Sequence, residues 1–367
     1  MSHTKNNILA QHATNRDLSI AAPPLTTRTS SDFASDEIFV PLDERIISGT
    51  AEALESGQTH YVDVPGIAPL RAAVADYLRE ATQATTQAAN VVITAGIQES
   101  RFLTIQMIGE NFDRLAMPSV VHPGVRRALG VRPMPVEMLA ADAPSGYLTP
   151  VSEIQRALAA GARFFYLESP ARLTGASYSE LDTSAIADLA AQYEATIIWD
   201  QGLAPWAASA PSLAAYAAEG AQIITIGEAF PGMGLSSWFI AYIASPQTLI
   251  PAMQSQKQIM AICTSTASQY GALEASRLFS EKQSAYAHQL QHKQSALRDL
   301  LAQQNIEVLP GDSATVLAFR ADAAPHLSED MANGADFGAP GVWRVTVSFS
   351  STSEAILNSV SGKGLAS

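Results

Sequence analysis

The chain has 367 residues, 47% of them hydrophobic, which is enough for one large domain or for a large and a small domain that share a core. Its 35 acidic residues against 22 basic ones give a net charge of -13, which repels phosphate backbones and anionic lipids, so we expect neither nucleic acid nor a membrane as partner. A single cysteine, no apolar run of membrane-spanning length and no secretion signal at the N-terminus lead us to expect a cytoplasmic protein.

The N-terminal residues show no helical periodicity. Residues 1–36 are rich in Ser, Thr, Asn and Pro, and we interpret them as an arm that orders by packing against another part of the protein. In the segment IAPLRAAVADYL, Leu70, Val74 and Leu78 share one stripe at helical spacing. This spacing predicts an amphipathic helix over residues 67–78.

Short β-rich runs then alternate with helical ones. The expected strands are NVVITA (90–95), FFYLES (164–169), ATIIWD (195–200), AQIITIG (221–227) and WFIAYIA (238–244). The expected helices between them are QESRFLTIQMIG (98–109), PVSEIQRALAAG (150–161) and SAIADLAAQYEA (184–195). Strands that are apolar on both faces and separated by helices indicate a mainly parallel sheet that is covered on both sides.

The last third of the chain has a different pattern. A long helical region begins at about residue 251 and leads to a smaller α/β unit that ends in WRVTVSFS. We therefore divide the chain into an N-terminal arm (1–36), a large domain (37–250), a connecting helical region (251–290) and a small C-terminal α/β domain (291–367).

These landmarks, in this order, resemble the fold-type I pyridoxal-phosphate enzymes, specifically the class I/II aminotransferases, over nearly the whole chain. The resemblance implies a mostly parallel seven-stranded sheet with helices on both faces. Tyr61 looks like the tyrosine that reaches the cofactor phosphate of the neighbouring subunit, which implies a homodimer. Gly96, Ile97 and Gln98 look like the phosphate-holding turn, and a glycine turn that opens a helix does present N–H groups and a positive dipole end to an anion.

Three further residues match substrate and cofactor positions of the family. Asp200, at the end of a buried strand, resembles the aspartate that pairs with the pyridine nitrogen, although a strand-end aspartate can also simply cap a loop. Arg344 resembles the arginine that grips the substrate α-carboxylate; the alternative is a surface ion pair. Arg172 replaces the asparagine that contacts the phenolic oxygen. Two guanidiniums in one cleft predict a locally positive site for a small, amino-acid-like carboxylate.

The resemblance fails at the lysine that forms the imine with the cofactor. No lysine occurs between Lys5 and Lys257. In TIGEAFPGMGLSSWFIAYIA, the position of that lysine falls on Pro231 or on Glu228, depending on the register. Neither side chain can form an imine, although Glu228 could act as a base. We therefore expect pyridoxal or pyridoxamine phosphate to bind only noncovalently, and whether either binds is left open.

Two more positions bear on this cofactor. The phosphate-binding arginine of the family falls on Phe239. Lys257 lies in the helical run QSQKQIM, where we expect a solvated lysine, as is usual for this residue type. His288 and His292 are four residues apart on a helix but lack a third ligand, so we expect no metal site.

Three functions follow from these observations. The first is an aminotransferase-like enzyme that acts on a small amino-acid-like carboxylate without a lysine–pyridoxal phosphate imine, with Asp200 and Glu228 as catalytic candidates. The alternative is a non-catalytic homologue that serves as a binding or partner subunit. The third, an ordinary aminotransferase that uses Lys257, is the least supported by the sequence.

Overall fold

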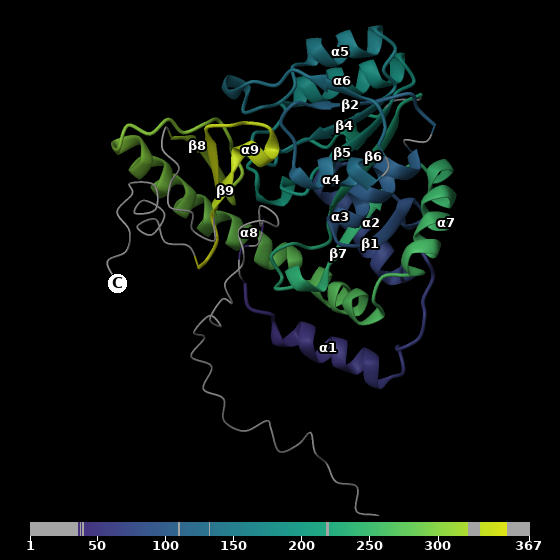
Figure 1. Ribbon diagram of the computed structural model, residues 1–367. Helices are drawn as coiled ribbons and strands as arrows, with labels where there is room; N and C mark the ends of the chain where they lie inside the picture. Colours follow the sequence, from purple (N-terminus) through teal and green to yellow (C-terminus); the bar gives the residue numbers. More distant parts are fainter. Residues whose placement is uncertain are drawn as a thin grey trace, which may run out of the picture.

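The structure is a computed structural model in which two sheets and their helices form the described part of the chain (Figure 1). It describes residues 36, 38, 40–108, 111–131, 133–217, 220–321 and 331–350. Of the arm expected over residues 1–36, only Asp36 lies among the described residues. Within the described residues, no helix combines the length and the apolar character needed to cross a membrane.

The larger sheet has seven strands in the order β1-β7-β6-β5-β4-β2-β3. These are β1 Val91–Ala95, β2 Leu115–Pro118, β3 Val136–Leu139, β4 Phe164–Glu168, β5 Thr196–Asp200, β6 Gln222–Glu228 and β7 Ile240–Ala244. Only β7 runs antiparallel to its neighbours, β1 and β6. The mostly parallel seven-stranded sheet is confirmed, as are the five strands expected from the sequence, while β2 and β3 were not predicted.

Both faces of this sheet are buried at its inner strands β4 and β5, because their alternate residues meet different helices. Phe165 and Ile197 point to the cluster that contains α5 and α6. Phe164 and Ile198 point to the opposite cluster, with α3, α4 and α7. The helices are α2 Ala68–Thr82, α3 Ile97–Leu103, α4 Pro123–Val131, α5 Val151–Ala159, α6 Glu180–Gln192 and α7 Ile250–Ala261.

The stripe predicted for residues 67–78 is the buried face of α2. Leu70, Val74 and Leu78 are all buried there, in the cluster that also contains Ile93 of β1 and Ala272. Burying this apolar face is what holds the helix on the sheet, since propensity alone stabilises a helix of this length only weakly.

A single long helix, α8 Thr266–Gln303, joins the two sheets (Figure 1). Its first half packs on α1 Glu44–Glu55 and α2, and its second half packs on the smaller sheet through Leu290 and Leu297. That sheet is antiparallel, in the order β8-β10-β9, and α9 Gly334–Phe337 follows β9. Its strands are β8 Val316–Arg320, β9 Met331–Asn333 and β10 Val342–Thr346. The boundary that we placed after residue 290 lies inside α8, and the division into domains stays a prediction.

The topology collects polar residues at one edge of the large sheet. Because β4, β5 and β6 are parallel, their carboxyl ends lie side by side, and they carry Glu168, Asp200 and Glu228. β1 runs in the same direction as β6, since both are antiparallel to β7, so α3 begins at the same edge. Ligands of open α/β sheets usually bind at such an edge.

Candidate functional site

Asp200 is the centre of the buried charges at this edge. Its Oδ1 accepts hydrogen bonds from Nε and Nη2 of Arg172, at 3.1 and 2.8 Å, and from the backbone N–H of Gly202 at 3.1 Å. Its Oδ2 accepts from Nε and Nη2 of Arg101, at 3.1 and 2.8 Å, and from the hydroxyl of Tyr166 at 2.6 Å. A carboxylate offers about four lone-pair positions, so these donors saturate it.

Simple geometry explains why these groups meet. Tyr166 and Glu168 are two residues apart on β4 and therefore share one face, and Glu168 lies opposite Asp200 in the register of β4 and β5. Arg101 lies on α3, whose buried face covers the same side of the sheet. Glu168 in turn accepts from the backbone N–H groups of His122, at 2.8 Å, and Arg172, at 3.0 Å.

The protonation of Asp200 follows from its neighbours. Burial by itself would raise the pKa of this carboxyl, but the guanidiniums of Arg172 and Arg101 and the Tyr166 hydroxyl hold the pKa well below its usual value. Burial and the same two arginines lower the pKa of His122. Asp200 is therefore an anion and His122 is neutral at pH 7, and neither titrates near neutrality.

Two other carboxyls have the opposite shift. Burial raises the pKa of Glu228 to about 7, against the opposing effect of Arg172. Burial and the negative charge of Asp200 likewise raise the pKa of Glu168. Of these two, Glu228 is partly open to solvent whereas Glu168 is buried. Glu228 is therefore the better placed of the two to exchange a proton with a ligand near neutral pH.

Arg344 and Arg172 share a second carboxylate, that of Asp36. Nη1 of Arg172 lies 2.7 Å from Oδ2 of Asp36, and Nη2 of Arg344 donates to Oδ1. Both arginines are buried. Asp36 and Asp200 pair with these two guanidiniums, but Asp200 also pairs with a third one, that of Arg101, so the locally positive site stays a prediction.

Lys257 is not the solvated residue that we expected. Its side chain is 0% exposed, and its Nζ lies 3.0 and 2.9 Å from the two carboxylate oxygens of Glu99 and 3.0 Å from Oγ1 of Thr264. Glu99, in the first turn of α3, also accepts from the backbone N–H of Ala95, the last residue of β1. The expectation failed because the apolar burial of α7 places this side chain between two elements that no local pattern connects.

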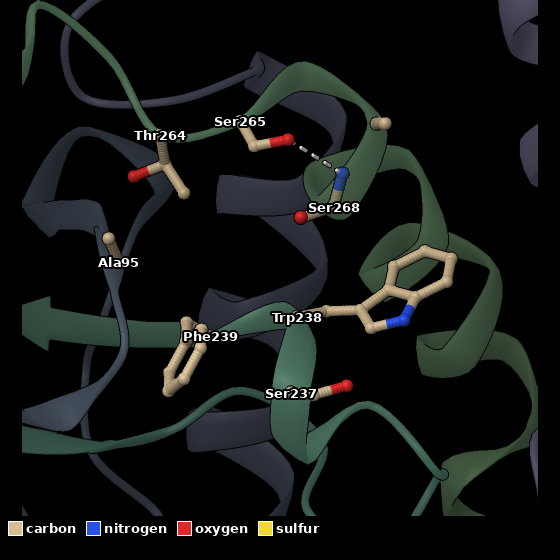
Figure 2. A pocket seen from close by; sticks show the side chains of 8 residues that line it. Ala95, Ser237, Trp238, Phe239, Thr264, Ser265 and Ser268 are labelled. Atoms are coloured by element: carbon tan, nitrogen blue, oxygen red, sulfur yellow. Dashed lines mark hydrogen bonds between the residues drawn. The ribbon is translucent and has the colours of Figure 1, made fainter.

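The turn expected to hold a phosphate is partly covered by an aromatic ring. Gly96 has φ +79°, a conformation that favours glycine, and a Cβ at this position would lie 3.3 Å from the ring of Phe239. Ile97 and Gln98 follow as the first residues of α3, and Nε2 of Gln98 donates to the carbonyl of Gly124 at 2.8 Å. Phe239 also lines a pocket of about 450 Å³ with Trp238 and Ala95 (Figure 2).

The model of the family "Aminotransferase class I and II" matches residues 32–357, which is most of the chain. This chain belongs to that family.

Its similarity to individual members is moderate. A probable aspartate/prephenate aminotransferase of Aquifex aeolicus is 26% identical over 71% of this chain and 66% of its own length. The aspartate/prephenate aminotransferase of Thermus thermophilus is 24% identical, over 63% of this chain and 60% of its own length. The matches thus span less than two thirds of these relatives.

Solved structures show the same fold. A Thermus thermophilus aspartate aminotransferase mutant superposes with a TM-score of 0.79 at 20% identity, covering 91% of this chain and 95% of the other. The Thermotoga maritima aspartate aminotransferase gives 0.80 at 18% identity, with 91% of each chain covered. The described chain therefore has the α/β fold of the pyridoxal-phosphate-dependent aminotransferases.

The family's cofactor does not fit the residues of this member. A pyridinium N–H needs a free lone pair on Asp200, but Arg101, Arg172, Tyr166 and Gly202 already occupy both oxygens. Lys257 is the first lysine after the position expected for the imine-forming lysine of the family. It is buried in an ion pair with Glu99. We therefore derive no chemical step through pyridoxal phosphate.

Sequence reasoning found Asp200, Arg172 and Arg344 but missed three of their partners. A signal existed for Tyr166, because the period of a strand places it on the face of Asp200 once β4 and β5 are paired. Arg101 lay in a segment predicted as a helix, where an arginine is ordinarily solvent-exposed. No sequence pattern indicated Asp36, because it lies 308 positions from its partner Arg344 in the chain. Tyr61 is 81% exposed, and its role at a neighbouring subunit stays a prediction.

Proposed function

We propose that this aminotransferase-family protein recognises a small, amino-acid-like carboxylate at Arg344 and Arg172 and works without a lysine–pyridoxal phosphate imine. The observation that carries the proposal is the saturation of Asp200 by the protein's own donors. A homodimer and a cytoplasmic location stay predictions that accompany it.

The arginine pair supports the carboxylate part of the proposal. Arg344, on β10 of the smaller sheet, and Arg172, after β4 of the larger sheet, each direct a terminal nitrogen to one carboxylate. Each charge-assisted hydrogen bond of this kind contributes about 1.5–3 kcal/mol. A ligand carboxylate in the same position would bridge the two sheets.

Glu228 supports a catalytic function. Its pKa of about 7 lets it accept a proton from a bound ligand and return it under ordinary conditions. Asp200, by contrast, stays ionised and holds Arg172 and Arg101 in position. In this proposal Glu228 moves the proton, Asp200 orients the arginines, and Arg344 with Arg172 binds the carboxylate.

A second candidate function is a non-catalytic binding or partner subunit. It is favoured by the fact that Arg101, Arg172, Arg344, Asp36 and Asp200 form ion pairs within the chain itself. The two functions differ at Glu228: replacement by glutamine should abolish turnover in an enzyme but leave partner binding intact.

The absence of an imine is tested directly. The purified protein is incubated with pyridoxal phosphate, reduced with borohydride and digested, and its peptides are analysed by mass spectrometry. We expect no reduced adduct in residues 225–242 or at Lys257, and no imine band in the visible absorption spectrum. An adduct at Lys257 would instead support the hypothesis of an ordinary aminotransferase that uses this lysine.

Recognition of a carboxylate is tested by calorimetric titration with a panel of amino and keto acids. Arg344→Ala should weaken binding at least about tenfold, which corresponds to about 1.4 kcal/mol. Arg320→Ala is a suitable control, because Arg320 lies on the neighbouring strand β8 in a solvent-exposed ion pair with Glu307. Equal affinity of both variants and the unaltered protein would remove Arg344 from the site.

A further inference from the structure

Asp36 places a carboxylate where the proposed ligand would place its own. Oδ2 lies 2.7 Å from Nη1 of Arg172, and Oδ1 accepts from Nη2 of Arg344. One oxygen on each guanidinium is a geometry that a free carboxylate can reproduce. Asp36 belongs to the segment that precedes α1, whereas the two arginines belong to the parts of the chain that build the two sheets.

Other contacts fix the two arginines without the help of Asp36. Nε and Nη2 of Arg172 donate to Asp200, at 3.1 and 2.8 Å. Nε of Arg344 donates to the carbonyl of Arg172 at 2.9 Å, and Nη1 donates to Oγ1 of Thr346 at 3.0 Å. Groups that are already oriented lose little conformational entropy when a ligand binds. The pair is therefore a preformed carboxylate site.

Asp36 is also the member of the cluster that faces solvent. Its side chain is 17% exposed, against 1% for each arginine, so an incoming ligand meets Asp36 first. Two residues further on, Ile38 is buried beside Leu203 and Trp206, and its carbonyl accepts from the backbone N–H of Phe349 at 3.0 Å. This anchor tethers Asp36 near the arginines, and a short tether gives an effective concentration on the order of millimolar.

We infer that Asp36 is an internal occupant of the carboxylate site and that a small carboxylate ligand binds by displacing it. The inference rests on the proposed function, since it concerns the same two arginines. A tethered competitor lowers the apparent affinity by the fraction of molecules in which the site is open. Ligand binding is thereby coupled to release of the Asp36 carboxylate from the two arginines.

The experiment compares Asp36→Asn with the unaltered protein, using succinate as the probe. The amide keeps the size of the side chain and removes its charge, so succinate should bind at least about tenfold more tightly in calorimetry. Succinamide, the neutral analogue, should show no such gain. Asp188→Asn, at an exposed position on α6, is the matched control and should bind succinate as the unaltered protein does.

Each outcome has a distinct meaning. Equal succinate affinity of Asp36→Asn and the unaltered protein would overturn the displacement of Asp36 and leave the proposed carboxylate site standing. Absence of succinate binding in both, with folding verified by circular dichroism, would overturn the proposed site and the displacement together.

A measurement on the unaltered protein covers the case in which Asp36→Asn does not fold. Hydrogen exchange of the peptide that contains Asp36 is followed with and without saturating succinate. Displacement predicts faster exchange in this peptide while peptides around Arg172 and Arg344 exchange more slowly. Unchanged or slower exchange around Asp36, at a succinate concentration that slows the arginine peptides, contradicts the inference.

Discussion

Buried charge at the edge of the large sheet is stabilised by reciprocal pairing. Arg101, Arg172 and Arg344 are each almost fully buried, and a guanidinium in such a position is tolerated only with a paired and hydrogen-bonded anion. Asp200 and Asp36 provide these anions. The three guanidiniums share these two aspartates, so removing either aspartate leaves fewer anions to pair with them.

At the same scale, Glu228 makes stability depend on pH. Its pKa is raised by burial from an ordinary 4.5 to about 7. Between these values the unfolded chain releases the proton first, so the contribution of Glu228 to stability is fully present below pH 4.5 and is lost as pH rises to 7. Glu228→Gln should therefore match the unaltered protein at pH 4 and exceed its unfolding free energy at pH 8, by at most about 3 kcal/mol. Denaturant titration at both pH values measures this.

Glu153→Gln is the control of opposite sign. Hydrogen bonds from Arg156 lower the pKa of Glu153, so its charged form stabilises the folded state above the ordinary pKa. This variant should be slightly less stable than the unaltered protein at pH 8. If Glu228→Gln gains nothing at pH 8, Glu228 is ionised at little cost and is not a proton-transfer group tuned to neutrality.

At the scale of elements, an ion pair fastens α7 to the start of α3. Lys257 of α7 reaches Glu99 in the first turn of α3, and Oγ1 of Thr264, which also contacts Lys257, donates to the carbonyl of Ile93 in β1 at 3.3 Å. At this buried point α7 is thus joined to β1 and α3, which follow each other in the chain but are distant from α7 in sequence. The pair therefore positions α7 against the start of α3.

Lys257→Met should destabilise the protein by about 3–5 kcal/mol, because it leaves the Glu99 carboxylate buried without its cation. The double variant with Glu99→Gln should recover part of this loss, as measured by denaturant unfolding. Lys282→Met is the control: Lys282 pairs with Asp43 nearer the surface, and its loss should cost no more than about 1 kcal/mol. If Lys257→Met and Lys282→Met lost equal unfolding free energy, the buried pair would stabilise the protein no more than the pair nearer the surface.

At the scale of the whole molecule, the large side chains of Trp238 and Phe239 line the pocket of Figure 2. Phe239 is exposed, and other exposed large apolar side chains include Tyr61, Ile259, Met260 and Ile262. The end of α7 and the start of α8 bring the last three close to Thr264 of the pocket wall, and Oγ1 of Thr266 donates to the carbonyl of His60 at 3.0 Å. Exposed apolar groups of this kind usually mark a protein interface.

We therefore expect sedimentation equilibrium to give about twice the 38.9 kDa of one chain. Phe239→Asp should shift the protein towards the monomer, because it introduces a charge among apolar side chains at the expected interface. Leu181→Asp, at an exposed apolar position on α6 away from these residues, should not change the mass. If the unaltered protein were monomeric, the predicted dimer would be wrong, and so would the predicted role of Tyr61 at the neighbouring subunit.

The sequence by itself determined the fold class, since alternating apolar runs and the stripe of Leu70, Val74 and Leu78 are local signals that burial converts into strands and helices. It also placed Asp200 at the end of its strand. The four-residue strands β2 and β3 were too short to stand out. Only the tertiary structure decided the charge pairs, because Arg101 lies 99 positions from Asp200 and Lys257 lies 158 from Glu99. Such pairs depend on how whole elements pack, and no local periodicity encodes that.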